Sequence, residues 1–300
     1  IGIGIASPLQ NYLFEEAFEI LDASSNGMKA GGGDTLVLWE NIYSLGDSGE
    51  FFVPIPRPGS KRFHILGLGG DGVTGIKANS DTRIVTIGKD AVVTFEYISF
   101  LAGNETLGNG GAINLIDGGE LTLHMCTVNG SFAIGNGGGI YVGQHSAFTV
   151  LNSFINSNDA SAGGGLYCAG SCTVSGLRIQ SNTASNGGGG LYVSSTGSLY
   201  TNGSLIVESN LAKYGGGITV EGDMYGLHHE VSVLRNIARY GGGIFIEQGS
   251  LYNNTDLRVE LNAAQTELGD EMVLNKFANI GLKLKENGGG GGIFFFLSGT

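Results

Sequence analysis

The side chains with the most evident binding chemistry are aromatic residues that recur at one position after runs of glycine. Tyr141, Tyr167 and Tyr192 each stand one residue beyond the aliphatic residue that follows a Gly-Gly-Gly run, and Phe245 takes the same place after Thr219 interrupts the series. On a β-strand these positions point outward, so the rings form an amphipathic strip that can bind sugar rings or pack laterally against another rod. The alternative is simple stacking of strand-favouring residues.

Acid–base cleavage of a sugar chain would need carboxyl groups that converge in one groove. No outward position in this series is acidic. Charged residues on the last predicted strand of each coil alternate in sign, as solvated ion pairs do: Arg178, Glu208, Arg258 and Glu260. Since no convergent carboxylate cluster is evident, we expect no catalytic residues and no enzymatic activity.

The best candidate for a metal site is His228-His229-Glu230. Adjacent residues of a strand face opposite ways, so the two histidines cannot both hold one ion from a regular strand. Asp71, in Gly-Gly-Asp-Gly, only loosely resembles a calcium-binding turn. We therefore expect no metal and no cofactor.

Three cysteines are too few for a disulfide scaffold. Cys126 and Cys168 fall on inward positions and are expected to behave as small core residues. Cys172 lies four residues beyond Cys168 across a turn, so the two can form a local disulfide and leave Cys126 free. Such a bond would indicate an oxidising compartment.

A repeat holds these side chains in place. Aliphatic residues end successive glycine-rich turns at spacings of 27, 26, 25, 27 and 26: Ile113, Ile140, Leu166, Leu191, Ile218 and Ile244. Three short alternating runs follow each turn, which predicts three parallel sheets wound around a dry core. The fold class is therefore all-β, a right-handed single-stranded parallel β-helix with three strands in each coil of roughly 25 residues.

Two further inward rows support this register. They are Val142, Cys168, Val193, Val220 and Ile246, and then Val128, Ile155, Ile179, Val207, Val233 and Val259. A polar row follows three residues after the last of these: Asn158, Asn182, Asn210, Asn236 and Asn262. We interpret it as a structural ladder, in which each asparagine takes a left-handed conformation and bonds its amide to the coils above and below.

The whole chain, 1–300, is predicted to be one β-helix domain. Residues 1–33 are expected to contain a strand and a capping helix (Pro8 to Ala23), 34–108 irregular first coils, 109–264 regular coils, and 265–300 degenerate terminal coils. A solenoid exposes sheet edges and core at its ends, and an amphipathic helix suits the role of cap. The C-terminal run Ile293, Phe294, Phe295 and Phe296 is expected to be an apolar assembly end.

The composition of the chain indicates which binding partners to expect. Of 300 residues, 55 are Gly, 14% are charged, and the net charge is −12. An acidic surface argues against nucleic acid and anionic membranes, and no apolar stretch is long enough to predict membrane insertion. The first residue is Ile rather than Met, which fits a processed or truncated secreted protein. In a eukaryotic secretory pathway, four sequons would be N-glycosylation candidates on turns or outer faces: Asn104, Asn129, Asn202 and Asn253.

Several of these signals resemble a known superfamily. The helix, then Gly-Asp-Thr-Leu-Val-Leu, then Phe63 to Gly69, then glycine-rich coils, is similar to the pectin-lyase-like right-handed β-helices. The paired signals Gly-Gly-Ala/Gly-Ile and Val/Ile-x-x-Asn resemble repeats of chlamydial polymorphic outer-membrane proteins, which carry Phe where Val or Ile stands here. This likeness covers about residues 100 to 270.

These features predict an extracellular or cell-surface rod with a structural or adhesive role, a secreted glycoprotein that assembles head-to-tail into a filament. Its partners would be other copies of itself, glycans or surface molecules. The alternative is a β-helix that binds or cleaves polysaccharide.

Overall fold

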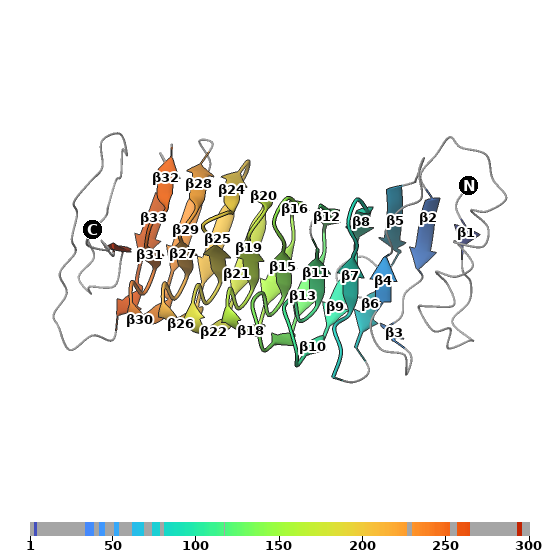
Figure 1. Ribbon diagram of the computed structural model, residues 1–300, viewed down its shortest axis with the longest axis horizontal. Helices are drawn as coiled ribbons and strands as arrows, with labels where there is room; N and C mark the ends of the chain where they lie inside the picture. Colours follow the sequence, from blue (N-terminus) through green and yellow to red (C-terminus); the bar gives the residue numbers. More distant parts are fainter. Residues whose placement is uncertain are drawn as a thin grey trace.

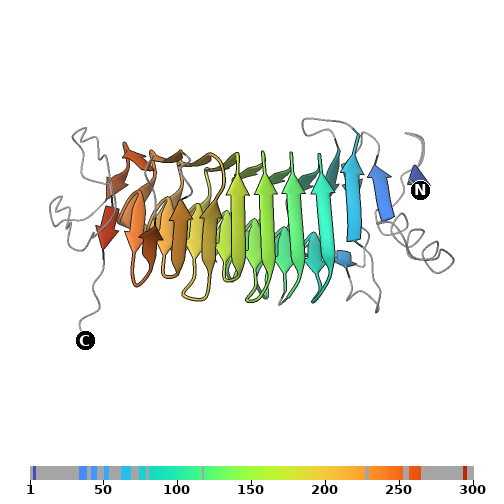
Figure 2. The same cartoon turned by 90° about the horizontal axis from the view of Figure 1, so that it is seen from above.

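The computed structural model is a parallel β-solenoid, an all-β rod whose coils stack along its long axis (Figure 1). Figure 2 shows equivalent strands of successive coils side by side and pointing the same way. The structure describes residues 3–4, 34–38, 42–45, 51–53, 62–68, 74–78, 81–116, 118–226, 230–252, 257–264 and 293–295. No helix occurs among them. The proposed capping helix, Pro8 to Ala23, lies outside these residues.

The coils build four parallel sheets, where the sequence predicted three. Sheet C, which opens each coil, holds β4 (Phe51–Val53), β7 (Val85–Ile87), β11 (Ile113–Leu115), β15 (Ile140–Val142), β19 (Leu166–Cys168), β23 (Leu191–Val193), β27 (Ile218–Val220), β31 (Ile244–Ile246) and β35 (Ile293–Phe295). Sheet A follows with β1 (Ile3–Gly4), β2 (Asp34–Leu38), β5 (Arg62–Gly67), β8 (Val92–Glu96), β12 (Glu120–His124), β16 (Ala147–Leu151), β20 (Ser171–Ser175), β24 (Ser198–Thr201), β28 (Asp223–Gly226) and β32 (Ser250–Tyr252).

The remaining two sheets complete each coil. Sheet B holds β3 (Ile42–Ser44), β6 (Gly75–Lys77), β9 (Ser99–Leu101), β13 (Thr127–Asn129), β17 (Phe154–Asn156), β21 (Leu177–Gln180), β25 (Leu205–Glu208), β29 (Val231–Leu234) and β33 (Leu257–Glu260). Sheet D holds β10 (Asn104–Glu105), β14 (Phe132–Ala133), β18 (Asp159–Ala162), β22 (Thr183–Gly187), β26 (Leu211–Tyr214), β30 (Ile237–Tyr240) and β34 (Ala263–Ala264).

Sheet D is the strand set that the sequence did not predict. Its inward residues are alanines rather than branched aliphatics, so its strands lack a strong hydrophobic alternation: Ala160, Ala184, Ala212 and Ala238 are all buried. Small side chains suffice because the glycine run of the preceding coil lies directly against this backbone. A Cβ on Gly189 would come 2.5 Å from the carbonyl oxygen of Leu211. The first glycine of the same run, Gly188, has a φ of +61°, which favours glycine.

The predicted inward rows form the core. Ile140, Leu166, Leu191 and Ile218 pair in register along sheet C and are completely buried. The rows through Val193 and Val207 are buried in the same way, although Val259, at the last described coil of sheet B, is only partly so. Each side chain packs mainly against its equivalents one coil away, so burial of the core depends on a constant register.

The asparagine ladder runs along the corner between sheets B and D. The Nδ2 of Asn182 donates to Oδ1 of Asn210 at 3.0 Å and to the carbonyl of Ile155 at 3.1 Å, and its backbone N–H donates to the same Oδ1 at 2.9 Å. The pattern repeats along the row, and all five amides are at most 5% exposed: Asn158, Asn182, Asn210, Asn236 and Asn262.

The expectation that these asparagines are left-handed is wrong. The left-handed residue is the one before each of them, with φ between 53° and 57°: Ser157, Ser181, Ser209, Arg235 and Leu261. This preceding residue turns the corner, and the asparagine is then free to direct its amide into the stack rather than to make the turn itself.

Replacing Asn210 by Ala should destabilise the protein strongly. The change removes the acceptor of the Asn182 N–H and the donor to the Ile179 carbonyl, both buried, and each buried polar group left without a partner costs about 1–3 kcal/mol. We expect a loss of roughly 3 kcal/mol in unfolding free energy, measured by chemical denaturation. Asn202→Ala, at an exposed turn position, is the control and should change it by less than about 0.5 kcal/mol. Equal losses in the two variants would contradict this account of the ladder.

Candidate functional site

The aromatic residues of the predicted strip line up in one row on the outward face of sheet C, but only Tyr141 and Tyr167 are partly exposed, whereas Tyr192 is 8% and Phe245 4% exposed. Tyr141, Tyr167 and Tyr192 are aligned by strand pairing from β15 to β23, and we call them the sheet C stripe. Their rings stack at centroid distances of 5.4 and 5.0 Å with interplanar angles of 14° and 11°. Parallel strands lie about 4.8 Å apart, so identical residues in one row are forced into such a stack.

The stripe is interrupted at Thr219, whose neighbours in the same row are Tyr192 and Phe245. A threonine is much smaller than the rings on either side, and a cavity of about 250 Å³ opens over it. Tyr214 of sheet D closes one side, with its ring 5.1 Å from that of Phe245 and tilted by 46°. The described residues that line this Thr219 cavity are Asn186, Gly187, Tyr192, Tyr214, Thr219, Glu221, Phe245 and Glu247.

Gly187 lines the Thr219 cavity, and a side chain at this position would crowd Tyr192 and Thr219. A Cβ at this position would lie 3.0 Å from Cε2 of Tyr192 and 3.2 Å from Oγ1 of Thr219. The Thr219 hydroxyl is turned away to donate to the Tyr214 carbonyl at 3.1 Å. The cavity therefore presents ring surface and carboxyl groups to a ligand, with the hydroxyl already engaged.

Two carboxyl groups converge in the Thr219 cavity. Glu221 and Glu247 each follow a strand of sheet C, on adjacent coils, and their backbone N–H groups bond to the coil before at 2.8 and 3.1 Å. The hydroxyl of Tyr192 donates to Glu221. Burial raises the pKa of Glu247, and the neighbouring Glu221 raises it further through its charge and a hydrogen bond between the two groups. The protonated form of Glu247 is therefore favoured in the folded protein.

The sequence prediction that carboxylates do not converge is therefore wrong at this place. That prediction considered the central outward residue of each sheet C strand, whereas Glu221 and Glu247 lie just past the strand end. The signal that could have revealed them is their equivalence: Val220-Glu221 and Ile246-Glu247 occupy the same position one coil apart.

A second aromatic row was also missed. Tyr200, Tyr225 and Tyr252 stack on the outward face of sheet A with centroid distances of 4.9 Å at both steps, and we call them the sheet A stripe. On sheet D, Tyr214 stacks on Tyr240 at 5.2 Å. The Nζ of Lys213 lies 5.0 Å from the centroid of the Tyr214 ring, close enough for a cation–π contact.

The charged residues of sheet B form ordered ion pairs. Glu208 is 8% exposed and lies between Arg178, at 3.0 Å, and Arg235. Arg258 pairs with Glu260 at 2.7 Å. These contacts cross from coil to coil or lie along one strand, so the carboxylates of Glu208 and Glu260 are each paired with a guanidinium group.

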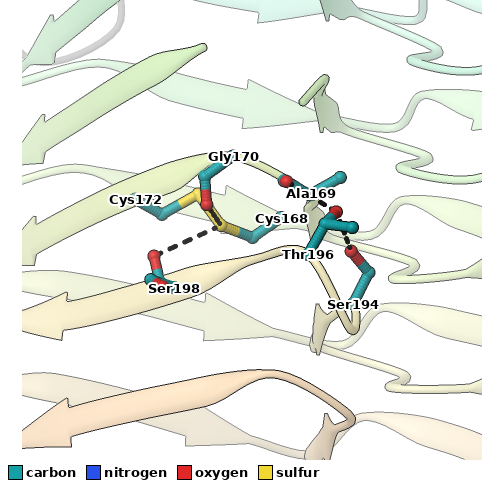
Figure 3. Close-up of a disulfide and its surroundings, with 7 residues drawn as sticks. All are labelled: Cys168, Ala169, Gly170, Cys172, Ser194, Thr196 and Ser198. Carbon is teal, nitrogen blue, oxygen red and sulfur yellow. Dashed lines mark hydrogen bonds between the residues drawn. A yellow bond between two sulfur atoms is a disulfide. The ribbon is translucent and has the colours of Figure 1, made fainter. Parts of the chain in front are cut away.

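Cys168 and Cys172 form a disulfide with an S–S distance of 2.07 Å, at the corner between sheets C and A (Figure 3). Both are completely buried, in rows that hold Val193 and Leu199 in the next coil. Cys126 is a free, buried thiol, and burial raises its pKa to about 12, so it is unreactive at neutral pH.

The other candidates fall in different places. Asn202 is exposed after β24, Asn129 is half-buried at the end of β13, and the Nδ2 of Asn104 donates to Asp81 at 2.6 Å. β35 pairs with β31, which extends sheet C. The predicted residues outside the described part of the chain are Asp71, His228, His229, Asn253 and Phe296.

Neither a metal-binding cluster nor a membrane-spanning helix is found among the described residues. They contain no group of three or more His, Cys, Asp or Glu side chains placed to hold a metal ion. They also include no helix with the length and apolar character needed to span a bilayer.

The raised pKa of Glu247 predicts that the stability of the fold depends on pH. Folding favours the protonated form of this side chain, so its stabilising contribution is complete below the ordinary glutamate pKa of about 4.3. That contribution is lost as the pH rises through the raised pKa. Glu247→Gln keeps a neutral donor at every pH. Its denaturation midpoint should match that of the parent near about pH 4 and exceed it near about pH 7. Glu120→Gln, at an exposed position of sheet A, should show no such dependence on pH. A Glu247→Gln difference that is constant with pH would contradict the raised pKa of Glu247.

Comparison with known proteins finds no family model and no curated protein that matches the chain.

Proposed function

We propose that this chain is an extracellular adhesive or structural rod that binds polysaccharide along the outward face of sheet C. The observation that carries the proposal is the sheet C stripe together with the Thr219 cavity that ends it. The stripe runs parallel to the rod axis, so a polymer of repeating units can meet one aromatic side chain in each coil. Aromatic rings with polar tips suit sugars, which present both C–H faces and hydroxyl groups.

The Thr219 cavity is the natural anchoring point on this face. Tyr141 and Tyr167 cover part of each other's ring faces, because they stack at 5.4 Å. Tyr192 has Tyr167 on one side only, and toward Thr219 its ring lines the cavity. One sugar residue of a bound chain would enter there, while its neighbours lie along the stripe.

Binding is better supported than cleavage. Cleavage needs two carboxyl groups that flank the scissile sugar bond and act on it as acid and base or nucleophile. Glu221 is instead engaged by the hydroxyl of Tyr192, whereas the stripe offers ring surface on successive coils. We therefore propose polysaccharide retention and not hydrolysis.

Two observations support an extracellular location. The Cys168–Cys172 disulfide is of a kind that persists in oxidising compartments. The repeats resemble those of the pectin-lyase-like right-handed β-helices and of chlamydial surface proteins, where such solenoids act outside the cell. N-glycosylation at Asn202, which is exposed, is part of the same proposal.

Replacing Tyr167 and Tyr192 together by Ala should abolish retention of the protein on a polysaccharide array. The double change removes two rings of the stripe and one wall of the cavity. Aromatic residues at the centre of a binding surface typically contribute about 2 kcal/mol or more, so we expect the affinity to fall at least about thirtyfold. The matched control is Tyr200→Ala with Tyr225→Ala, which removes two equally stacked rings from sheet A. Equal losses in both double variants would show that the sheet C face is not the binding surface.

Head-to-tail assembly is a second proposal. Among the described residues β35 is an edge strand of sheet C, since it pairs with β31 and with no further strand. A parallel edge strand presents backbone N–H and C=O groups to which another copy can add, and the contact would be open and heterologous.

This assembly predicts concentration-dependent growth. Light scattering at rising protein concentration should show a continuous increase in mean mass, without a plateau at a dimer. A protein that stays monomeric at the highest soluble concentration would overturn the filament proposal and leave the glycan proposal standing.

A further inference from the structure

The Thr219 cavity combines two kinds of side chain that the rest of the stripe keeps apart. Its wall holds the rings of Tyr192, Tyr214 and Phe245, and beside them the carboxyl groups of Glu221 and Glu247. No Lys or Arg is among the described residues that line it. Ring faces and carboxylates in one concave site are the chemistry that recognises an organic cation.

We propose that the Thr219 cavity binds the ammonium group of an amino-sugar residue, so that the ligand of this face is a polymer containing free amino sugars. The inference rests on the proposed function and names the class of sugar that the face prefers. Glu221 and Glu247 accept hydrogen bonds from the ammonium group, while the ring of the sugar lies against Tyr192 and Phe245.

The hydrogen-bonding capacity of the pair fits this ligand. Glu221 accepts from the Tyr192 hydroxyl, and a carboxylate has further lone-pair sites for a ligand. Glu247 lines the same cavity. An ammonium group supplies three donors, enough to bond to both carboxyl groups. A cation at this place also offsets the charge of Glu221, which raises the pKa of Glu247.

Charge excludes the main alternatives. A polymer of uronic acids would place its carboxylates against Glu221 and Glu247 on a protein of net charge −12. The described lining contains no Lys or Arg, although Lys213 contacts the Tyr214 ring beside it. The described residues hold no group of three or more His, Cys, Asp or Glu side chains placed for a metal ion such as calcium. A neutral sugar can use the rings and donate hydroxyl groups to the carboxylates, but it lacks the charge attraction that an ammonium group adds.

The test compares two probes of equal length, an oligomer of glucosamine and an oligomer of N-acetylglucosamine. They differ in whether the nitrogen is charged. Calorimetry at about pH 6, where amines are protonated, should show at least tenfold tighter binding of the glucosamine oligomer to the parent protein. The double variant Glu221→Gln with Glu247→Gln should lose that preference.

Two controls separate this site from general attraction to an acidic protein. Glu120→Gln with Asp159→Asn removes the same charge from exposed positions on other sheets and should keep the preference. Thr219→Tyr retains both carboxyl groups but continues the stripe and fills the cavity, so it should lose tight binding of the glucosamine oligomer. Thermal melting of each variant establishes that it is folded.

The outcomes distinguish this inference from the function on which it rests. Equal binding of the two probes by the parent, or equal losses in the two charge-removing double variants, overturns the amino-sugar site. If neither probe binds while other glycans are retained through Tyr167 and Tyr192, the amino-sugar inference fails and the proposed function stands. If no glycan is retained at all, both fail.

Discussion

A buried asparagine amide makes all of its hydrogen bonds in this protein only when the coils before and after it are in the same register. Asn182 donates to Asn210 ahead and to the Ile155 carbonyl behind, and its own oxygen accepts from Asn158. Leaving one of these groups unpaired in the interior would cost more than a single hydrogen bond contributes. The ladder therefore fixes how successive coils align along the rod axis. This alignment determines which side chains form the core rows and which form rows on the outer faces.

A fixed register turns each sequence position into a row of side chains. On the inside, the rows are aliphatic and close-packed. On the outside, residues of the same type at the same position in successive coils form a continuous row. A residue of a different type in such a row changes the shape of the surface at that place. Thr219 between Tyr192 and Phe245 is such a departure, because the loss of one ring opens a cavity that its neighbours still line. We infer that a binding site can form on this scaffold where the repeat is broken.

Much of the fold can be predicted from the sequence, because the spacing of the repeats shows which residues of successive coils align. Glycine runs at a nearly constant spacing predicted the sheet C strands and the inward rows. The asparagines from Asn158 to Asn262 predicted the ladder. Sheet D was missed because its inward alanines carry little hydrophobic signal. The sheet A stripe was missed because the corner before it varies in length, from a separation of six positions between Val142 and Phe148 to one of four between Cys168 and Cys172. The convergence of Glu221 with Glu247 depends on strand-end positions that a search of strand centres does not reach.

The most direct measurement is a crystal structure of the protein soaked with a glucosamine oligomer. The account predicts a sugar ring over Thr219, packed on Tyr192, with its amino nitrogen within hydrogen-bonding distance of both Glu221 and Glu247 and the remaining residues along Tyr167 and Tyr141. An ordered oligomer on another face, such as the sheet A stripe, with the Thr219 cavity holding only solvent, would contradict it.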